Sequence, residues 1–385
     1  MDSELGIKRN VMIVAGEASG DIYGAQVAKE TMRRAPCVRF FGIGGSHMRE
    51  AGVDTLVDSA DMAVVGFVEV LRHFDVIANA FLKLRKILLT TPPDLLVLID
   101  YPGFNLRLAS VARKAGVKVL YYISPQIWAW RQGRIKKIAR LVDHMAVIFP
   151  FEVSYYQQAG VPVSFVGHPM YDMVVVNKQR SEAAASFGLD PSRKIIGLFP
   201  GSRRSEIRLL LPVIVEAATL LRKRFPDAQF VLPLASTLCE GDISPKLRER
   251  GLDVVITHKR IHDLIQACDA VICVSGTVTL EIALVGTPMV VIYKLSPLTY
   301  WIARLLVHVN NIAICNIVAG ETVVRELIQE QANPRMISEE IFLILENNSY
   351  RDSMKRKLAT IREKLQCGGA SRNIAELILQ LTGLS

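Results

Sequence analysis

One acid stands where a parallel sheet would present it to a ligand. Asp100 directly follows the apolar run Leu95–Ile99 and opens a short polar stretch that ends at Asn105. In α/β proteins, ligands bind beyond the carboxyl ends of the strands. A carboxylate whose pKa is raised toward neutrality can act there as a general base. A helix cap or a structural ion pair is the alternative interpretation of Asp100.

Two turns in the second half of the chain suit a nucleotide diphosphate. In the first, Gly201, Ser202 and Arg203 follow an apolar run and open a helical pattern. The small residues let the backbone approach phosphate oxygens, and the guanidinium offers a planar charged fork to the same oxygens. A basic turn at the surface is the alternative interpretation.

In the second turn, Ser275, Gly276 and Thr277 separate an apolar run from a helix, and Glu281 follows one helical turn later. That spacing places Thr277 and Glu281 on one helix face. The backbone N–H groups could hold a pyrophosphate while the carboxylate accepts hydrogen bonds from ribose hydroxyls. A solvated helical glutamate is the alternative, but the turn at Arg203 favours a nucleotide.

A third turn near the N-terminus contains Gly16, Glu17, Ser19 and Asp21, which follow the apolar run Val11–Ala15. Glycine permits a positive φ, and serine and aspartate are good N-cap residues. The spacing matches neither the dinucleotide fingerprint nor the P-loop. An ordinary strand-to-helix turn with a capping aspartate is the alternative to a ligand-binding turn.

Two other stretches suit a sugar, an acyl chain or a membrane interface. Residues 121–131 hold two of the three tryptophans beside a basic run, and the candidate contacts there are Gln126, Trp128 and Arg131. Residues 62–74 are apolar without a clean strand or helix period, and the candidate acyl contacts there are Val64, Val65, Phe67, Val68 and Leu71. Core packing is the alternative for both stretches.

Short apolar runs that alternate with helical periods must position these residues. The predicted strands are Val11–Ala15, Val38–Gly42, Leu95–Ile99, Val117–Tyr122, His144–Phe149, Val163–Val166, Ile195–Phe199, Gln229–Leu232, Asp253–Thr257, Ala270–Val274 and Met289–Tyr293. Continuous apolar runs are typical of parallel strands buried on both faces. The pattern predicts two doubly wound, Rossmann-like α/β domains that face a cleft, at 1–170 and 171–345, with C-terminal helices at 346–385 that pack back across both.

Composition limits the class of protein. Half of the 385 residues are hydrophobic and 22% are charged, which allows two packed cores and disfavours disorder. The net charge of +9 suits nucleic acid, an anionic membrane or phosphorylated substrates. Because no nucleic-acid module is recognisable, that partner ranks last. The basic residues gather at 131–140 and 355–364, where a solvated helix face is the alternative.

The sequence predicts no cofactor, no metal and no membrane-spanning helix. The six cysteines are scattered, form no Cys-x-x-Cys pair and have no histidine cluster nearby. No signal-peptide pattern precedes the first strand, and no apolar run approaches the roughly 18 residues of a spanning helix. These features predict a cytoplasmic protein with reduced thiols.

Taken together, the segments closely resemble the lipid-A-disaccharide synthases, a family of bacterial glycosyltransferases. The matching stretches are GEASGD at 16–21, VVGFVEVL at 64–71, IDYPGFN at 99–105, SPQIWAWRQGRIKKI at 124–138, FVGHP at 165–169, FPGSRRSEI at 199–207, SGTVTLEIAL at 275–284, GTPMVVIYK at 286–294 and NIVAGETVVRELIQ at 316–329. The resemblance covers nearly the whole chain. The GEASGD and WAWR segments together are specific to the family, whereas the turns at Arg203 and Glu281 are shared by other glycosyltransferases.

The resemblance implies a GT-B glycosyltransferase that transfers 2,3-diacylglucosamine from UDP to 2,3-diacylglucosamine 1-phosphate. It implies an inverting, metal-free reaction that yields a β-1,6 disaccharide 1-phosphate. It also implies a peripheral location on the cytoplasmic side of the inner membrane, and it allows a homodimer. Asp100 would be the base, and Arg203, Glu281 and Asn316 would lie near the nucleotide. Many members carry a second acid where this chain has Gly103.

Two alternatives remain open at this point. A UDP-sugar 2-epimerase of the same fold would bind UDP alike, but it would leave the aromatic and apolar segments unexplained. A non-catalytic nucleotide-sugar sensor or membrane scaffold would bind the UDP-sugar without turnover, and it would place no demand on Asp100.

Overall fold

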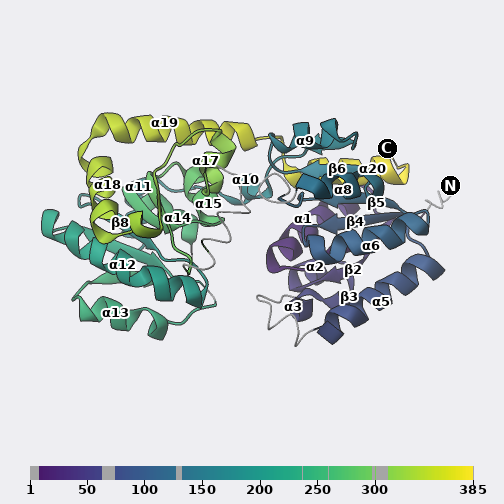
Figure 1. Ribbon diagram of the computed structural model, residues 1–385, viewed down its shortest axis with the longest axis horizontal. Helices are drawn as coiled ribbons and strands as arrows, with labels where there is room; N and C mark the ends of the chain where they lie inside the picture. Colours follow the sequence, from purple (N-terminus) through teal and green to yellow (C-terminus); the bar gives the residue numbers. More distant parts are fainter. Residues whose placement is uncertain are drawn as a thin grey trace, which may run out of the picture. The chain divides into compact units, whose positions relative to one another are not determined.

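The computed structural model describes residues 8–62, 74–126, 132–235, 237–258, 260–296, 300 and 311–384. The chain forms two compact units, one of Met1–Asp172 with Leu365–Ser385 and the other of Met173–Lys364. Each unit contains one parallel sheet with helices packed on it (Figure 1). The predicted fold class, two Rossmann-like halves with a helical C-terminal segment, is confirmed.

The sheet of the first unit has the strand order β3-β2-β1-β4-β5-β6-β7. Its strands are β1 (Arg9–Ala15), β2 (Val38–Gly44), β3 (Asp54–Asp58), β4 (Leu95–Ile99), β5 (Lys118–Tyr122), β6 (His144–Val147) and β7 (Val163–Phe165). Strand β1 pairs with β2 on one side and with β4 on the other, so the order reverses between β1 and β4. Such a reversal is the topological switch point at which ligands bind.

Helices cover both faces of this sheet, which is why its central strands are continuous apolar runs. The helices are α1 (Ala18–Arg34), α2 (Ser46–Glu50), α3 (Ser59–Met62), α5 (Phe74–Thr90), α6 (Pro102–Lys114), η1 (Gln132–Arg134), α8 (Ile135–Leu141), α9 (Glu152–Gln158), α10 (Pro169–Met173) and α20 (Ala370–Thr382). Met12, Val14, Leu96 and Leu98 are buried in one core cluster with side chains of α5, α6 and α8. Helix α20, at the far end of the chain, packs on α1, β4 and β5.

The second unit repeats the design with the strand order β10-β9-β8-β11-β12-β13, which reverses between β8 and β11. Its strands are β8 (Ile195–Phe199), β9 (Gln229–Pro233), β10 (Val254–Thr257), β11 (Ala270–Val274), β12 (Met289–Tyr293) and β13 (Glu326–Ile328). Its helices are α11 (Arg180–Ala185), α12 (Arg204–Arg224), η2 (Glu240–Asp242), α13 (Ser244–Glu249), α14 (Ile261–Ala267), α15 (Val278–Val285), α17 (Ile314–Ala319), η3 (Gln329–Gln331), α18 (Pro334–Glu346) and α19 (Asn348–Leu365). Strands β8 and β11 are buried throughout.

Candidate active site

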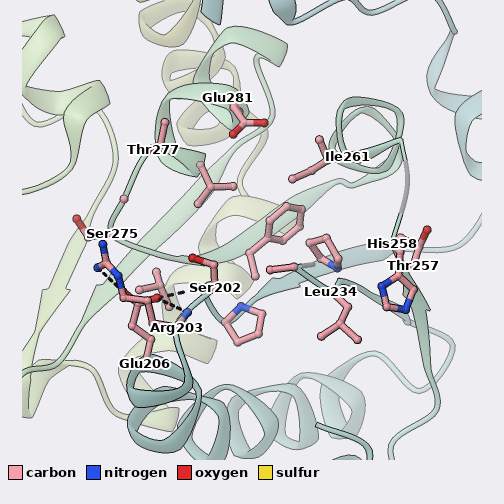
Figure 2. Close-up of a pocket in the computed structure, with 18 residues that line it drawn as sticks. Ser202, Arg203, Glu206, Leu234, Thr257, His258, Ile261, Ser275, Thr277 and Glu281 are labelled. Carbon is pink, nitrogen blue, oxygen red and sulfur yellow. Dashed lines mark hydrogen bonds and ion pairs between the residues drawn. The ribbon is translucent and has the colours of Figure 1, made fainter. Parts of the chain in front are cut away.

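A pocket of about 520 Å³ opens in the second unit at the switch point between β8 and β11. The turn that follows β8 and the turn that follows β11 form two of its walls, and the first turn of α15 adds a carboxylate (Figure 2). The pocket brings together all but one of the predicted donor-binding residues: Gly201, Ser202, Arg203, Ser275, Gly276, Thr277 and Glu281.

The turn after β8 is closed by a carboxylate from its own helix. Glu206 accepts hydrogen bonds from the backbone N–H groups of Ser202 (3.2 Å) and Arg203 (3.3 Å), and from Nη1 of Arg203 (3.0 Å) (Figure 2). Gly201 has a φ of +99°, and a Cβ there would strike the Glu206 carboxylate, so this turn requires glycine. The Arg203 side chain is 68% exposed and has N–H donors beyond the one that meets Glu206.

The turn after β11 directs a second helix N-terminus at the same pocket. Thr277 is the N-cap residue of α15, and the first N–H groups of a helix have no acceptor within it. Ser275 donates from its hydroxyl to the carbonyl of Ile312 (3.2 Å), which fixes the turn against the loop before α17. Two helix N-termini and an arginine at one pocket favour phosphate binding, and at the N-terminus of α12 a phosphate would compete with the Glu206 carboxylate for these N–H groups.

Sequence reasoning missed His262, which meets the predicted ribose ligand. Its Nε2 lies 3.2 Å from Oε2 of Glu281, and both side chains are mostly buried. An ionised carboxylate only accepts, so the Nε2 atom must carry the hydrogen. The imidazole therefore orients the Glu281 carboxylate. No local spacing signals this pair, because α14 and α15 bring together residues that are 19 positions apart.

Asn316 is the predicted donor residue that does not line the pocket. It is fully buried, and its Nδ2 donates to Oε1 of Glu326 (2.7 Å) while its other contacts are to the backbone of residues 323–324. Glu326 in turn accepts from the N–H of Ile312 (2.8 Å), whose carbonyl meets Ser275. Asn316 is thus connected to the pocket residue Ser275 through Glu326 and Ile312, and it makes no direct contact with the pocket.

In the first unit, Asp100 lies at the carboxyl end of β4, next to β1 at the switch point. Asp100 and Tyr101 both have left-handed backbones, with φ of +44° and +45°. For residues with a Cβ, each such conformation costs about 1–3 kcal/mol. Burial, together with the charge of Glu17, raises the pKa of Asp100 to about 6, although a hydrogen bond from the Tyr101 N–H acts to lower it. A carboxylate with this pKa is ionised at neutral pH. It also has a higher proton affinity than an ordinary carboxylate, which suits a general base.

The N-terminal turn and the Asp100 motif form one structure. Gly16 packs against the ring of Tyr101, and a Cβ at that glycine would lie inside the ring's contact distance. Glu17 is the exposed N-cap residue of α1, and Ser19 is exposed in its first turn. The turn therefore supplies space for Tyr101 and negative charge beside Asp100.

Asp21 caps a different helix from the one expected. Its buried carboxylate accepts from the backbone N–H groups of Gly45 (2.6 Å), His47 (3.1 Å) and Met48 (3.1 Å), and also contacts the His47 ring. Burial acts to raise the pKa of Asp21, but these hydrogen bonds outweigh it and lower the pKa. The interpretation of Asp21 as a cap of α1 is wrong, because the carboxylate holds the start of α2.

Several predicted contacts lie beyond what the structure describes. Gln126 is exposed at the end of a described stretch. Outside the described residues lie Val64, Val65, Phe67, Val68, Leu71, Trp128 and Arg131. The described residues contain no group of histidine, cysteine and acidic side chains that could hold a metal ion.

Comparison with known sequences decides the family. A family model described as lipid-A-disaccharide synthetase matches residues 11–380. The chain is 66% identical to a lipid-A-disaccharide synthase of Trichlorobacter lovleyi, over 98% of each chain. It is 60% identical to that of Geobacter sulfurreducens, over 97% of each. The chain belongs to the lipid-A-disaccharide synthase family. Like the other synthases of this family, it is a glycosyltransferase that uses a UDP-sugar donor.

Solved structures of low identity share the fold of this synthase family member. A Staphylococcus aureus MnaA–UDP co-structure matches with a TM-score of 0.67 at 12% identity, over 98% of each chain. MurG of Acinetobacter baumannii matches with a TM-score of 0.59 at 14% identity, over 97% of this chain and 99% of that one. At these identities the solved structures show the fold alone, so the family assignment rests on the sequence matches.

Gly103, the position where the family resemblance implies a second acid, lies in the first turn of α6. A Cβ at this position would meet nothing within 4 Å. The local packing therefore leaves room for a longer side chain, and the absence of the acid leaves Asp100 as the carboxylate of this motif.

Proposed function

We propose that Asp100 and the pocket of the second unit carry out the reaction of this family in the chain. In that reaction, 2,3-diacylglucosamine passes from UDP to the 6-hydroxyl of 2,3-diacylglucosamine 1-phosphate, and a β-1,6 disaccharide 1-phosphate and UDP are formed. The observation that carries the proposal is a carboxyl with a pKa of about 6 at the switch point of the first sheet.

The donor's UDP occupies the pocket between β8 and β11 in this proposal. The diphosphate lies against the N-termini of α12 and α15, where Arg203 adds a permanent positive charge. Glu281, oriented by His262, accepts hydrogen bonds from the ribose hydroxyls. The charge that develops on the leaving UDP is then stabilised by groups that are already in place.

Asp100 acts on the acceptor. Its carboxylate takes the proton of the 6-hydroxyl as that oxygen attacks the anomeric carbon of the donor sugar. The bond from the anomeric carbon to the UDP oxygen breaks with its electron pair, and the configuration at that carbon inverts. The chain needs no covalent intermediate for this single displacement.

The direct test is to incubate the purified chain with both acylated substrates and to identify the products by mass spectrometry. We expect the disaccharide 1-phosphate and UDP in equal amounts. We expect no UDP-ManNAc when UDP-GlcNAc is supplied alone. Formation of UDP-ManNAc without disaccharide would instead support the epimerase.

We also infer that the chain binds peripherally to an anionic membrane on the cytoplasmic side. Helix α8 exposes Lys136 and Lys137, and α5 exposes Leu82 and Leu89 at 54% and 51% beside Lys83. Basic and apolar side chains together favour adsorption to anionic lipid. No helix within the described ranges has the length and apolar character to cross a bilayer.

A further inference from the structure

We propose that Tyr121 and Asn105 are positioning residues that hold the strained backbone of Asp100 and thereby aim its carboxylate at the acceptor. The inference rests on the proposed role of Asp100 as the base. It concerns two buried residues that the reaction scheme above does not use.

The backbone is strained where β4 ends. Asp100 and Tyr101 are consecutive residues in the left-handed region, and neither is a glycine. A residue with a Cβ stays in this region only where its surroundings fix it there. Something in the fold must therefore hold the backbone of Asp100 where β4 ends.

The holding contacts converge on one carbonyl. The Asp100 carbonyl accepts from the Tyr121 hydroxyl at 2.7 Å and from Nδ2 of Asn105 at 2.7 Å. The Asp100 N–H donates to the carbonyl of Tyr122 at 3.0 Å. Both backbone polar groups of Asp100 are thus fixed, one by side chains and one by a strand. The fixed backbone sets the direction of the Cα–Cβ bond of Asp100, from which its carboxylate extends.

The two donors come from different elements and are fully buried. Tyr121 belongs to β5 and Asn105 to α6, and neither side chain is exposed. Asn105 also donates to the carbonyl of Ile99 at 3.1 Å, so it spans the last residue of β4 and Asp100. Buried polar groups are costly unless paired, and these pair at the place where the chain is strained.

The neighbouring residue supplies a matched control. Tyr122 is on the same strand and is equally buried, but its hydroxyl has no hydrogen-bond partner among the described residues. Tyr121→Phe and Tyr122→Phe each remove one buried hydroxyl from β5. Of the two substitutions, only Tyr121→Phe removes a hydrogen bond to the carbonyl of Asp100, which then keeps only the bond from Asn105.

The test measures kcat, the KM for the UDP donor and the pH profile of kcat for both variants. We expect Tyr121→Phe to lower kcat about tenfold with the donor KM within about twofold of the wild type, which corresponds to loss of one well-made hydrogen bond. The acid limb should move to lower pH, because a carboxylate that leaves its buried position is better hydrated. Tyr122→Phe should leave kcat and the limb unchanged. Asn105→Ala, if it folds, should act like Tyr121→Phe.

If Tyr121→Phe matches Tyr122→Phe in kcat and in the acid limb, the positioning role is wrong. Asp100→Asn separates that result from failure of the proposed function. An inactive Asp100→Asn variant together with two equivalent tyrosine variants overturns only the positioning role. Normal turnover in Asp100→Asn overturns the assignment of the base and this inference with it.

Discussion

Asp100 combines a left-handed backbone with a carboxyl whose pKa is raised by burial and by the charge of Glu17. The folded chain therefore binds this proton more tightly than the unfolded chain does. Between pH 3.8 and about 6 the folded state holds more protons, so the contribution of Asp100 to stability falls as the pH rises. Above about pH 6 the group is ionised in both states, and its destabilising contribution to the free energy of unfolding reaches its full value.

Asp100→Asn should stabilise the fold at neutral pH. The amide is never ionised, so we expect the free energy of unfolding to rise by about 1–3 kcal/mol at a pH of about 7.5. At a pH of about 3.5 the Asp100 carboxyl is mostly protonated in both the folded and the unfolded chain. The difference in the free energy of unfolding between the two proteins should therefore largely vanish. Denaturant unfolding of both proteins at the two pH values measures this. An equal difference at both would show that Asp100 is not the cause.

Arg203→Ala should weaken UDP binding. Loss of a charge-assisted contact costs about 1.5–3 kcal/mol, so the dissociation constant should rise at least about tenfold. Arg204→Ala is the matched control, because that exposed neighbour does not line the pocket. Isothermal titration calorimetry with UDP gives both values. Equal affinities for the two variants would remove Arg203 from the diphosphate site.

The sequence predicts pocket residues correctly where they belong to one strand-to-helix turn. The residues after β8 and β11 are identified by their own turns, and the pocket contains them. The pair of His262 with Glu281 and the reach of Asp21 to α2 join separate elements, so no spacing along the chain signals them. Asn316 was found only through the family resemblance, and its buried amide shows an indirect contact with the pocket.

Among the elements, the central strands are identified by their residues, whereas two of the four edge strands are not. Strands β4, β8, β11 and β12 have the predicted bounds, because burial on both faces requires an unbroken apolar run. The residues of β3 and β13 do not form a recognisable strand pattern. Both lie at a sheet edge, and β3 contains two acidic residues and is only half buried. A strand at a sheet edge can be short and only partly buried, so the residue pattern of β3 and β13 is hard to distinguish from that of a loop.

Gly16→Ala should disturb the contact between the β1–α1 turn and the start of α6. The added methyl would meet the Tyr101 ring, which must move and take the Asp100 backbone with it. Overpacking of this kind costs about 1–3 kcal/mol, and turnover should fall as well. Gly103→Ala is the control, because its Cβ would enter open space. Thermal unfolding and kcat measure both variants. Equal effects of the two substitutions would contradict the packing argument.

On the scale of the whole molecule, the same sheet plan occurs twice, and each copy carries a different part of the chemistry. The first unit holds the candidate base at its β1–β4 switch point, and the second holds the candidate nucleotide pocket at its β8–β11 switch point. The alternation of strands and helices predicted this duplication. The expectation that the C-terminal helices pack back onto the domains named no partner. In the structure α20 packs on α1, with Arg34 and Glu376 paired at 2.9 Å.

The membrane proposal predicts binding to anionic vesicles that salt weakens and detergent abolishes. Each basic residue near the surface contributes about 1 kcal/mol, so Lys136→Gln with Lys137→Gln should reduce vesicle binding more than tenfold. UDP affinity should not change. Lys355→Gln with Arg356→Gln removes the same charge from exposed positions on α19 and is the control. Vesicle sedimentation measures the binding. Absence of wild-type binding at low salt, or equal loss in the control, would contradict the proposal.

The pH dependence of kcat for disaccharide formation tests the central claim most directly, because it reports the protonation of the base itself. The wild-type rate should rise with pH and level off above about pH 6, the pKa to which burial and Glu17 raise Asp100. Asp100→Asn should lower kcat by about 10²–10⁴-fold and abolish that limb. An Asp100→Asn variant that keeps near-normal turnover, or keeps the same acid limb, would contradict the assignment of Asp100 as the base.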